Sequence, residues 1–131
     1  MSAVRERIEL DAPLAGDFQP VVRLIIGGIA ERVDFAFEEI DDLQLAVERL
    51  LAETGSQRSV HMSFEIEEGH IRTRVGPLSE RGLGEALRDG DPTPGELTLK
   101  RILQTVVDSY GVEEVSNGGI VVRLEKLRGL P

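Results

Sequence analysis

The stretch Asp41-Asp42-Leu43-Gln44-Leu45-Ala46-Val47-Glu48-Arg49-Leu50-Leu51-Ala52 carries the most information in this sequence of 131 residues. It lies in a predicted helix over about 38–53, which Gly55-Ser56 ends. Glu48 lies one step off the apolar stripe of this helix, so we expect its carboxylate at the border between the core and a cleft. The stripe consists of Ile40, Leu43, Val47, Leu50 and Leu51.

Hydrophobic periodicity predicts two elements before this helix. The first is a strand over 4–10 at the edge of a sheet, broken by Asp11-Ala12-Pro13. The second is a helix over about 17–32 that contains Gly27-Gly28. Two adjacent glycines in a helix cost stability, but they allow another element to approach closely.

The clearest prediction is an antiparallel hairpin over 60–75 with a two-residue turn at Glu68-Gly69. Apolar and polar residues alternate along both strands, as they do when one face of a sheet is buried. The turn sets a register in which apolar residues meet on one face and charge-compatible residues on the other. The predicted pairs are Ile66 with Ile71, Phe64 with Thr73, Met62 with Val75, Glu65 with Arg72 and Glu67 with His70.

The last part of the chain predicts a short helix over 79–88, capped by Ser79, and then a longer helix. Thr93-Pro94-Gly95-Glu96 has the residues of a helix start, and the pattern continues to about 109. Tyr110 is expected in the buried stripe of this helix. A hairpin over 112–126, turning at 116–119, follows.

Composition restricts the functions open to the chain. Its formal net charge of −9 repels a phosphate backbone, so we expect no direct binding of nucleic acid. The absence of cysteine excludes disulfides, thiolate metal sites and a thiol nucleophile. No apolar run reaches membrane-spanning length and the first residues lack the apolar region of a signal peptide. We therefore expect a single domain over 1–131, cytoplasmic and without a membrane.

The predicted elements define the fold class. Their order is strand, helix, helix, strand, strand, variable segment, helix, strand, strand. Helices gathered on one face of a mixed, largely antiparallel sheet form a two-layer α+β sandwich.

This order resembles that of the anti-sigma-factor serine kinases, small bacterial members of the GHKL (histidine kinase-like) ATPase superfamily. The local likeness lies at 24–30, at 40–50, and at 99–108 followed by the Gly118-Gly119 turn. The resemblance covers about 4–127 and implies the GHKL fold. It also implies Mg-ATP as cofactor, held by three motifs that can be compared with this sequence residue by residue.

The first motif requires a Glu and, four residues later on the same helix face, an Asn that coordinates Mg²⁺. Glu48 matches the Glu, but Ala52 stands at the Asn position and has no ligand atom. Starting from Glu53 does not restore the motif, because Gln57 then lies beyond the expected helix end.

The second motif is an Asp that reads adenine, followed by a glycine-rich turn. Gly76-Pro77 resembles the turn, but Arg74 stands where the Asp is expected and Leu78 where a second glycine is expected. Arginine only donates hydrogen bonds, so it cannot accept the hydrogen bond that the adenine amino group donates.

The third motif opens the following helix, whose first amides face the phosphates. Here it reads Gly95-Glu96-Leu97, and Glu96 places a carboxylate where phosphate would bind. All three motifs are therefore altered.

We predict a regulatory protein-binding domain on a GHKL scaffold: an anti-sigma-factor-like pseudokinase that uses no cofactor. The resemblance implies that it acts in transcription regulation by sequestering a sigma factor or a STAS-domain anti-sigma-factor antagonist. It also implies a homodimer through the sheet and the first helix, which the Gly27-Gly28 face allows.

Two alternatives remain open. In one, the chain is an active ATP-dependent serine/threonine kinase that uses Mg-ATP, with Glu48 as general base and with Gly76 and Gly95 at the nucleotide. In the other, it is a ligand-binding or oligomerisation module of the same fold. We expect no metal site, because the predicted hairpin register separates His61 from His70.

Overall fold

The computed structural model describes residues 6–79, 82–88 and 98–129. The described residues form the following elements, in chain order: β1 (Glu6–Pro13), the 3-10 turn η1 (Gly16–Phe18), α1 (Gln19–Glu31), α2 (Phe37–Leu51), β2 (Ser59–Glu67), β3 (His70–Leu78), α3 (Leu83–Arg88), α4 (Leu99–Val106), β4 (Ser109–Glu114), the 3-10 turn η2 (Ser116–Gly118) and β5 (Ile120–Leu127).

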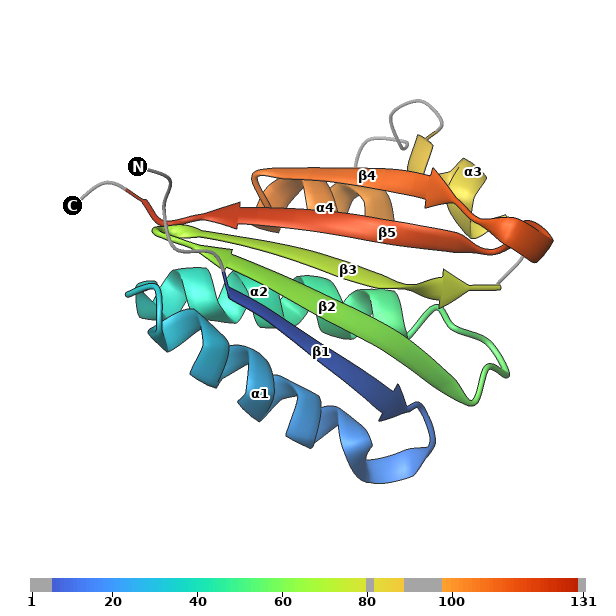
Figure 1. Cartoon of the computed structure of the whole chain (residues 1–131). Coiled ribbons are helices and arrows are strands. Elements are labelled where there is room, and N and C mark those ends of the chain that lie inside the picture. Colours follow the sequence, from blue (N-terminus) through green and yellow to red (C-terminus); the bar gives the residue numbers. More distant parts are fainter. Residues whose placement is uncertain (1–5, 80–81, 89–97, 130–131) are drawn as a thin grey trace.

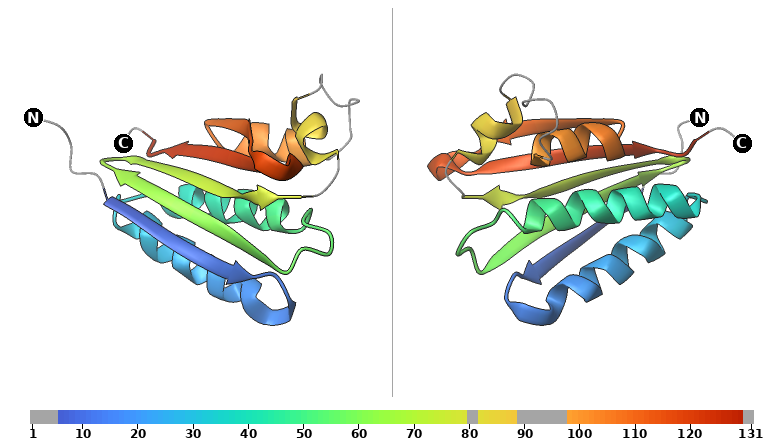
Figure 2. Two further views of the ribbon diagram at one scale, coloured as in Figure 1. Left: turned by 45° about the vertical axis from the view of Figure 1, so that its right-hand side comes forward. Right: turned by 180° about the vertical axis from the view of Figure 1, so that it is seen from behind.

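The strands form one sheet in the order β1-β2-β3-β5-β4, with the helices gathered on one of its faces (Figures 1 and 2). This is the predicted two-layer α+β sandwich. Every neighbouring pair of described strands is antiparallel, so the sheet is more uniform than the mixed sheet that the pattern predicted. Seen from behind, α2 runs between α1 and α4 (Figure 2), so its two sides face different helices.

The register of β2 and β3 is the predicted one. Ile66, Phe64 and Met62 oppose Ile71, Thr73 and Val75 on the face that packs against the helices. Glu65 opposes Arg72 and Glu67 opposes His70 on the other face, which we call the outer face. Gly69 in the turn has a φ of +68°, a conformation that favours glycine, so the turn and the alternation specify the same register.

β1 is an edge strand, as predicted, but it does not stop at Leu10. It pairs with β2 as far as Pro13, and Ala12 is buried opposite Val60. The prediction of a break at Asp11-Ala12-Pro13 was wrong because an edge strand tolerates proline, whose missing N–H need not serve a second neighbour.

α1 and α2 bury their apolar stripes against the sheet. Leu43, Val47, Leu50 and Leu51 of the predicted stripe are buried, while Ile40 is partly buried at its edge. The two helices pack side by side. A Cβ at Gly27 would lie 3.3 Å from the side-chain nitrogen of Gln44 in α2, so this glycine does permit a close approach.

The chain between β3 and β5 differs most from the prediction. α4 ends at Val106, and the strand β4 begins at Ser109, where the pattern predicted continuing helix. The change follows from Asp108, whose backbone N–H donates to Glu125 O (2.9 Å) and whose carboxylate accepts the N–H of Leu127 (2.8 Å). Tyr110 is therefore a strand residue, partly buried, and its hydroxyl donates to Leu87 O (3.0 Å).

Candidate functional site

Glu48 lies on the side of α2 that faces α1. Its carboxylate forms an ion pair with the guanidinium of Arg23 in α1, which also donates to Asp41 Oδ1 (3.0 Å). The hydrogen bond to Glu48 raises the pKa of Arg23. The carboxylate that the sequence placed at the border of a cleft is thus engaged between two helices.

Ala52 immediately follows the last residue of α2 and is exposed. Its methyl group supplies no metal ligand. For binding Mg²⁺, Glu48 and Ala52 therefore provide only one carboxylate, which is already paired with Arg23, and no second ligand atom.

The opposite side of α2 faces α4 and borders a groove. Leu45 and Arg49, which are four residues apart and so share one face of α2, line it together with Ile102, Thr105 and Val106 of α4. The side chains of α2 at this place are aliphatic and cationic.

Gly76 lies in β3 beside the neighbouring strand β5, where the register of the pair shifts between Val75 and Leu78. A Cβ at this position would be 2.8 Å from Ile120 O and 3.0 Å from Val121 Cα, so the close neighbour of Gly76 is the backbone of β5. The end of β3 is held by Gln57, whose side-chain amide donates to Pro77 O (2.8 Å) and accepts the N–H of Ser79 (3.1 Å). Ser79 immediately follows β3, and the prediction that it caps the next helix was wrong, because α3 begins at Leu83.

Arg74 lies on the outer face of the sheet, away from the helices. Its guanidinium donates to Glu65 Oε1 (2.6 Å) and lies 3.5 Å from Glu113 Oε1. Its neighbours in β3, Thr73 and Val75, are the residues that face the helix layer, and both are buried. The residue compared with the adenine-reading Asp therefore belongs to a surface network of ion pairs.

Glu125 is the centre of that network. Arg72 Nη2 (3.3 Å), His70 Nε2 (3.2 Å) and the hydroxyl of Ser109 (3.1 Å) all contact its carboxylate. Burial by itself raises the pKa of Glu125, but the hydrogen bond from Ser109 and the charge of Arg72 outweigh it, so the pKa lies below its usual value. Charges of both signs compensate one another across this face.

The third motif, Gly95-Glu96-Leu97, and its predicted cap Thr93 lie outside the described residues. The described start of α4 is capped instead by Thr98, whose side-chain oxygen accepts the N–H of Arg101 (3.2 Å).

The two histidines occur in separate places. His61 bridges Asp11 Oδ1 (2.6 Å) and Glu9 Oε1 (3.0 Å) across the β1–β2 pair. The hydrogen bonds to these carboxylates, above all the one to Asp11, raise the pKa of His61. His70 contacts Glu125 at the other end of the sheet. Among residues 6–79, 82–88 and 98–129, no group of three or more His, Cys, Asp or Glu side chains is arranged to hold a metal.

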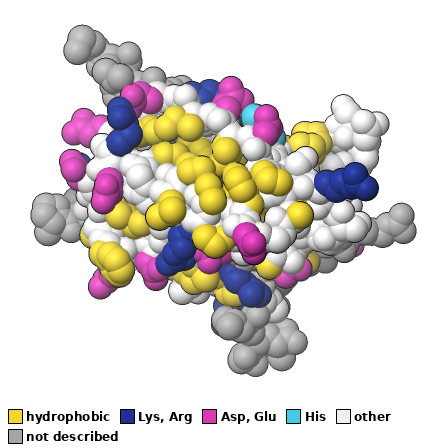
Figure 3. All heavy atoms as spheres, turned by 90° about the horizontal axis from the view of Figure 1, so that it is seen from below, with side chains coloured by type: hydrophobic (Ala, Val, Ile, Leu, Met, Phe, Trp, Pro, Cys, Tyr) yellow, Lys and Arg dark blue, Asp and Glu magenta, His cyan; other side chains and the backbone are white. Residues whose placement is uncertain are grey.

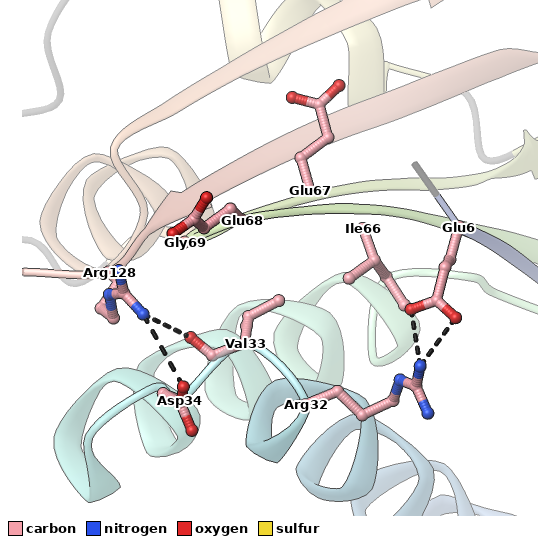
Figure 4. Close-up of a pocket in the computed structure, with 9 residues that line it drawn as sticks. All are labelled: Glu6, Arg32, Val33, Asp34, Ile66, Glu67, Glu68, Gly69 and Arg128. Atoms are coloured by element: carbon pink, nitrogen blue, oxygen red, sulfur yellow. Dashed lines mark hydrogen bonds and ion pairs between the residues drawn. The ribbon is translucent and has the colours of Figure 1, made fainter. Parts of the chain in front are cut away.

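A polar pocket lies at the end of the sheet, between the C-terminal end of α1 and the β2–β3 turn (Figure 4). Both of its drawn arginines have carboxylate partners in the pocket. Arg32 Nη2 contacts the two carboxylate oxygens of Glu6 at 2.7 Å each, and Arg128 lies 3.9 Å from Asp34. The two arginines of this pocket are therefore already paired with carboxylates that line it.

Comparison with known proteins gives the family. No family model matches the sequence. The serine-protein kinase RsbW of Bacillus thuringiensis (strain Al Hakam) is 33% identical over 115 residues, which are 88% of this chain and 68% of that protein. The chain belongs to the RsbW family. RsbW of Bacillus subtilis (strain 168) is 26% identical over 113 residues, 86% of this chain and 68% of the relative.

A solved structure agrees with the fold. The RsbU and RsbW domains of Rv1364c from Mycobacterium tuberculosis superpose with a TM-score of 0.69 at 12% identity, over 96% of this chain and 33% of that one. Membership in the RsbW family confirms the resemblance to anti-sigma-factor kinases with the GHKL fold. None of the described helices is both long enough and apolar enough to span a membrane.

The sequence analysis missed the two residues of α2 in this chain that border the α2–α4 groove. Leu45 and Arg49 flank Ala46-Val47-Glu48 and have the i, i+4 spacing that the motif demands. That spacing was a usable signal, but it fits more than one pair on α2. Only the packing of α1 and α4 against opposite sides of the helix separates the pairs.

Proposed function

We propose that this chain is a regulatory binding member of the RsbW family that does not transfer phosphate. The observation that carries the proposal is the division of α2 into two sides. Glu48 is paired with Arg23 on the α1 side, whereas the groove beside α4 is bordered by Leu45 and Arg49. The carboxylate of Glu48 is therefore already engaged by a cation, and the side chains of Leu45 and Arg49 supply no oxygen ligand for Mg²⁺.

Two further features support the loss of nucleotide binding. Arg74, at the position compared with the adenine-reading Asp, is committed to Glu65 on the outer face of the sheet. Gly76 has a structural reason to be glycine, because the backbone of β5 lies against it. Each lost charged hydrogen bond removes about 1.5–3 kcal/mol of binding energy, so the losses together weaken nucleotide affinity by several orders of magnitude.

The proposed action is sequestration of a sigma factor or a STAS-domain anti-sigma-factor antagonist by a single domain over 1–131, without a cofactor and in the cytoplasm. Membership in the RsbW family supports this kind of partner. The net charge of −9 favours a partner with a basic docking surface and disfavours direct contact with DNA.

We further propose that two copies pair through the face formed by β1 and α1. Seen from below, hydrophobic side chains gather in the middle of this face (Figure 3). Ile8 and Leu10 of β1 are only partly buried, and Val21 and Leu24 of α1 are 41% and 76% exposed. A Leu24→Asp variant is expected to shift the mass measured by light scattering from dimer to monomer; a monomeric parent chain would contradict the pairing.

The test of the proposed function is co-purification from the native cell combined with a phosphotransfer assay. We expect a sigma factor or a STAS-domain protein to be enriched with the tagged chain. We also expect radiolabelled ATP to leave that protein unlabelled. Enrichment of neither class of partner contradicts sequestration, and labelling contradicts the loss of activity.

An active kinase is the second candidate, favoured by the names of the relatives. In that case Glu48 acts as the general base, and Gly76 and Gly95 lie at a bound Mg-ATP. A Glu48→Gln variant separates the two candidates. If the chain is an active kinase, the variant should abolish the labelling of the partner that the parent chain produces. If Glu48 serves only in its ion pair with Arg23, the parent chain should give no labelling and the variant should capture the partner as well as the parent does.

A further inference from the structure

The groove between α2 and α4 combines apolar walls with an arginine that has no acidic partner among the residues that the structure describes. Leu45, Arg49, Ile102, Thr105 and Val106 line a volume of about 420 Å³, which is in the size range of small-molecule sites. It is distinct from the pocket of Figure 4, where the arginines already have carboxylates.

Arg49 is the polar element of the groove. Its Nε is buried and has no hydrogen-bond partner, although the side chain as a whole is only half-buried. The guanidinium also forms no ion pair with any carboxylate in the described parts of the chain. Arg123 has a similar buried Nε, but its guanidinium contacts Glu113 and Glu125. A partly desolvated cation without a counter-ion favours an anion that enters from outside.

The other residues that line the groove offer no free polar group to a ligand. Ile102 and Val106 are buried at the base of the groove, and Leu45 is 38% exposed at its rim. The hydroxyl of Thr105 already donates to Arg101 O of its own helix (2.8 Å). From the described residues, an entering ligand therefore meets aliphatic surface and the guanidinium of Arg49.

The single guanidinium and the aliphatic walls favour one class of anion over another. A triphosphate carries several negative charges, which a single arginine in a chain of net charge −9 does not balance. The described residues of the lining include no aromatic side chain on which a base could stack. A carboxylate matches one guanidinium in charge and in its two-pronged geometry, and an aliphatic chain matches the walls.

We propose that the α2–α4 groove binds an aliphatic carboxylate, with the guanidinium of Arg49 on the carboxylate and the chain against Leu45, Ile102 and Val106. This inference goes beyond the proposed function and holds whether or not the chain captures a partner protein.

The experiment titrates the ¹⁵N-labelled full chain with hexanoate and octanoate and follows amide shifts by NMR. Saturable shifts are expected at 45–49 and 102–106, and affinity should rise roughly fourfold with each added methylene. Octylamine, which has the same chain and the opposite charge, should bind at least tenfold more weakly. Equal binding of the amine, or shifts spread over the whole surface, would overturn the proposal.

Two variants locate the site. Arg49→Met keeps an apolar stem and removes the charge, and it should weaken octanoate binding about tenfold or more. Arg58→Met removes an exposed arginine outside the groove, and it should change nothing. If Arg49→Met alters the spectrum beyond the groove, Leu45→Gln at the exposed rim serves instead, and it should reduce the gain per methylene. Unchanged binding in the variant used contradicts the site. Shifts produced by Mg-ADP but not by octanoate contradict the ligand class.

Discussion

Replacement of Gly76 by alanine tests whether the sheet or a nucleotide accounts for this glycine. The added Cβ would lie 2.8 Å from Ile120 O and 3.0 Å from both Val121 Cα and Val121 Cγ2. Two of these three atoms belong to the backbone of β5, which is fixed by its pairing with both β3 and β4. The contact can be relieved only by shifting strands in the middle of the sheet.

Forcing one extra carbon into such a packed place costs about 1–3 kcal/mol of folding free energy. For 131 residues this is a fall in Tm of about 4–11 °C. The assay is thermal unfolding followed by circular dichroism, with urea unfolding as a second measure of the free energy. No nucleotide is added, because the predicted loss arises from the sheet alone.

Gly28→Ala is the matched control. No heavy atom outside the neighbourhood of Gly28 lies within 4 Å of a Cβ at this position in α1. Alanine there should stabilise the chain by about 0.5–1 kcal/mol through its higher helix propensity. If Gly76→Ala melts within a degree of the parent chain, or if Gly28→Ala loses as much stability, the steric reasoning is refuted.

Three further predictions concern single interactions. Glu48→Gln should lower the free energy of unfolding by only about 0.2–1 kcal/mol, and less in high salt, because its ion pair with Arg23 is partly exposed; a loss above about 2 kcal/mol in urea unfolding would contradict this. The hydrogen bond to Asp11 raises the pKa of His61, so the protonated imidazole should stabilise the fold fully below about pH 6.5 and lose this effect as the pH rises through the raised pKa. Urea unfolding between about pH 5.5 and 8.5 should show this small loss of stability in the parent chain but not in His61→Gln. Identical pH profiles of the two chains would contradict the prediction. Thr98→Ala should cost about 0.5–2 kcal/mol by removing the cap of α4, whereas Thr98→Ser should cost much less; equal losses in the two variants would exclude the cap as the cause.

The sequence predicted the parts of the fold in which local and tertiary preferences agree. The β2–β3 register follows from alternation on two faces and from a turn with Gly69, so each signal excludes a shift by one residue. The stripe of α2 was equally clear, because Leu43, Val47 and Leu50 recur at helical spacing.

The start of β4 could not be predicted from periodicity. Tyr110 lies four residues after Val106, as on a helix face, and two before Val112, as in a strand. Asp108 decides between the two by hydrogen bonding to β5, and such a contact between residues distant in sequence is invisible to a local pattern.

The candidate site was predicted less completely than the fold. Glu48 was correctly placed at the margin of the core, but its direction depends on Arg23, which is 25 residues away in another helix. Arg49 was overlooked because a charged residue on a helix surface usually faces solvent. Its importance emerges only when α4 is packed beside it.

Thermal denaturation with and without Mg-ADP tests the central claim most directly. A ligand present at one hundred times its Kd stabilises the native state by about 2.7 kcal/mol, which for 131 residues raises Tm by about 10 °C. We predict that millimolar Mg-ADP leaves the Tm unchanged, beyond the effect of the same concentration of magnesium chloride. A saturable rise of several degrees would show that this chain retains a nucleotide site and would contradict the account.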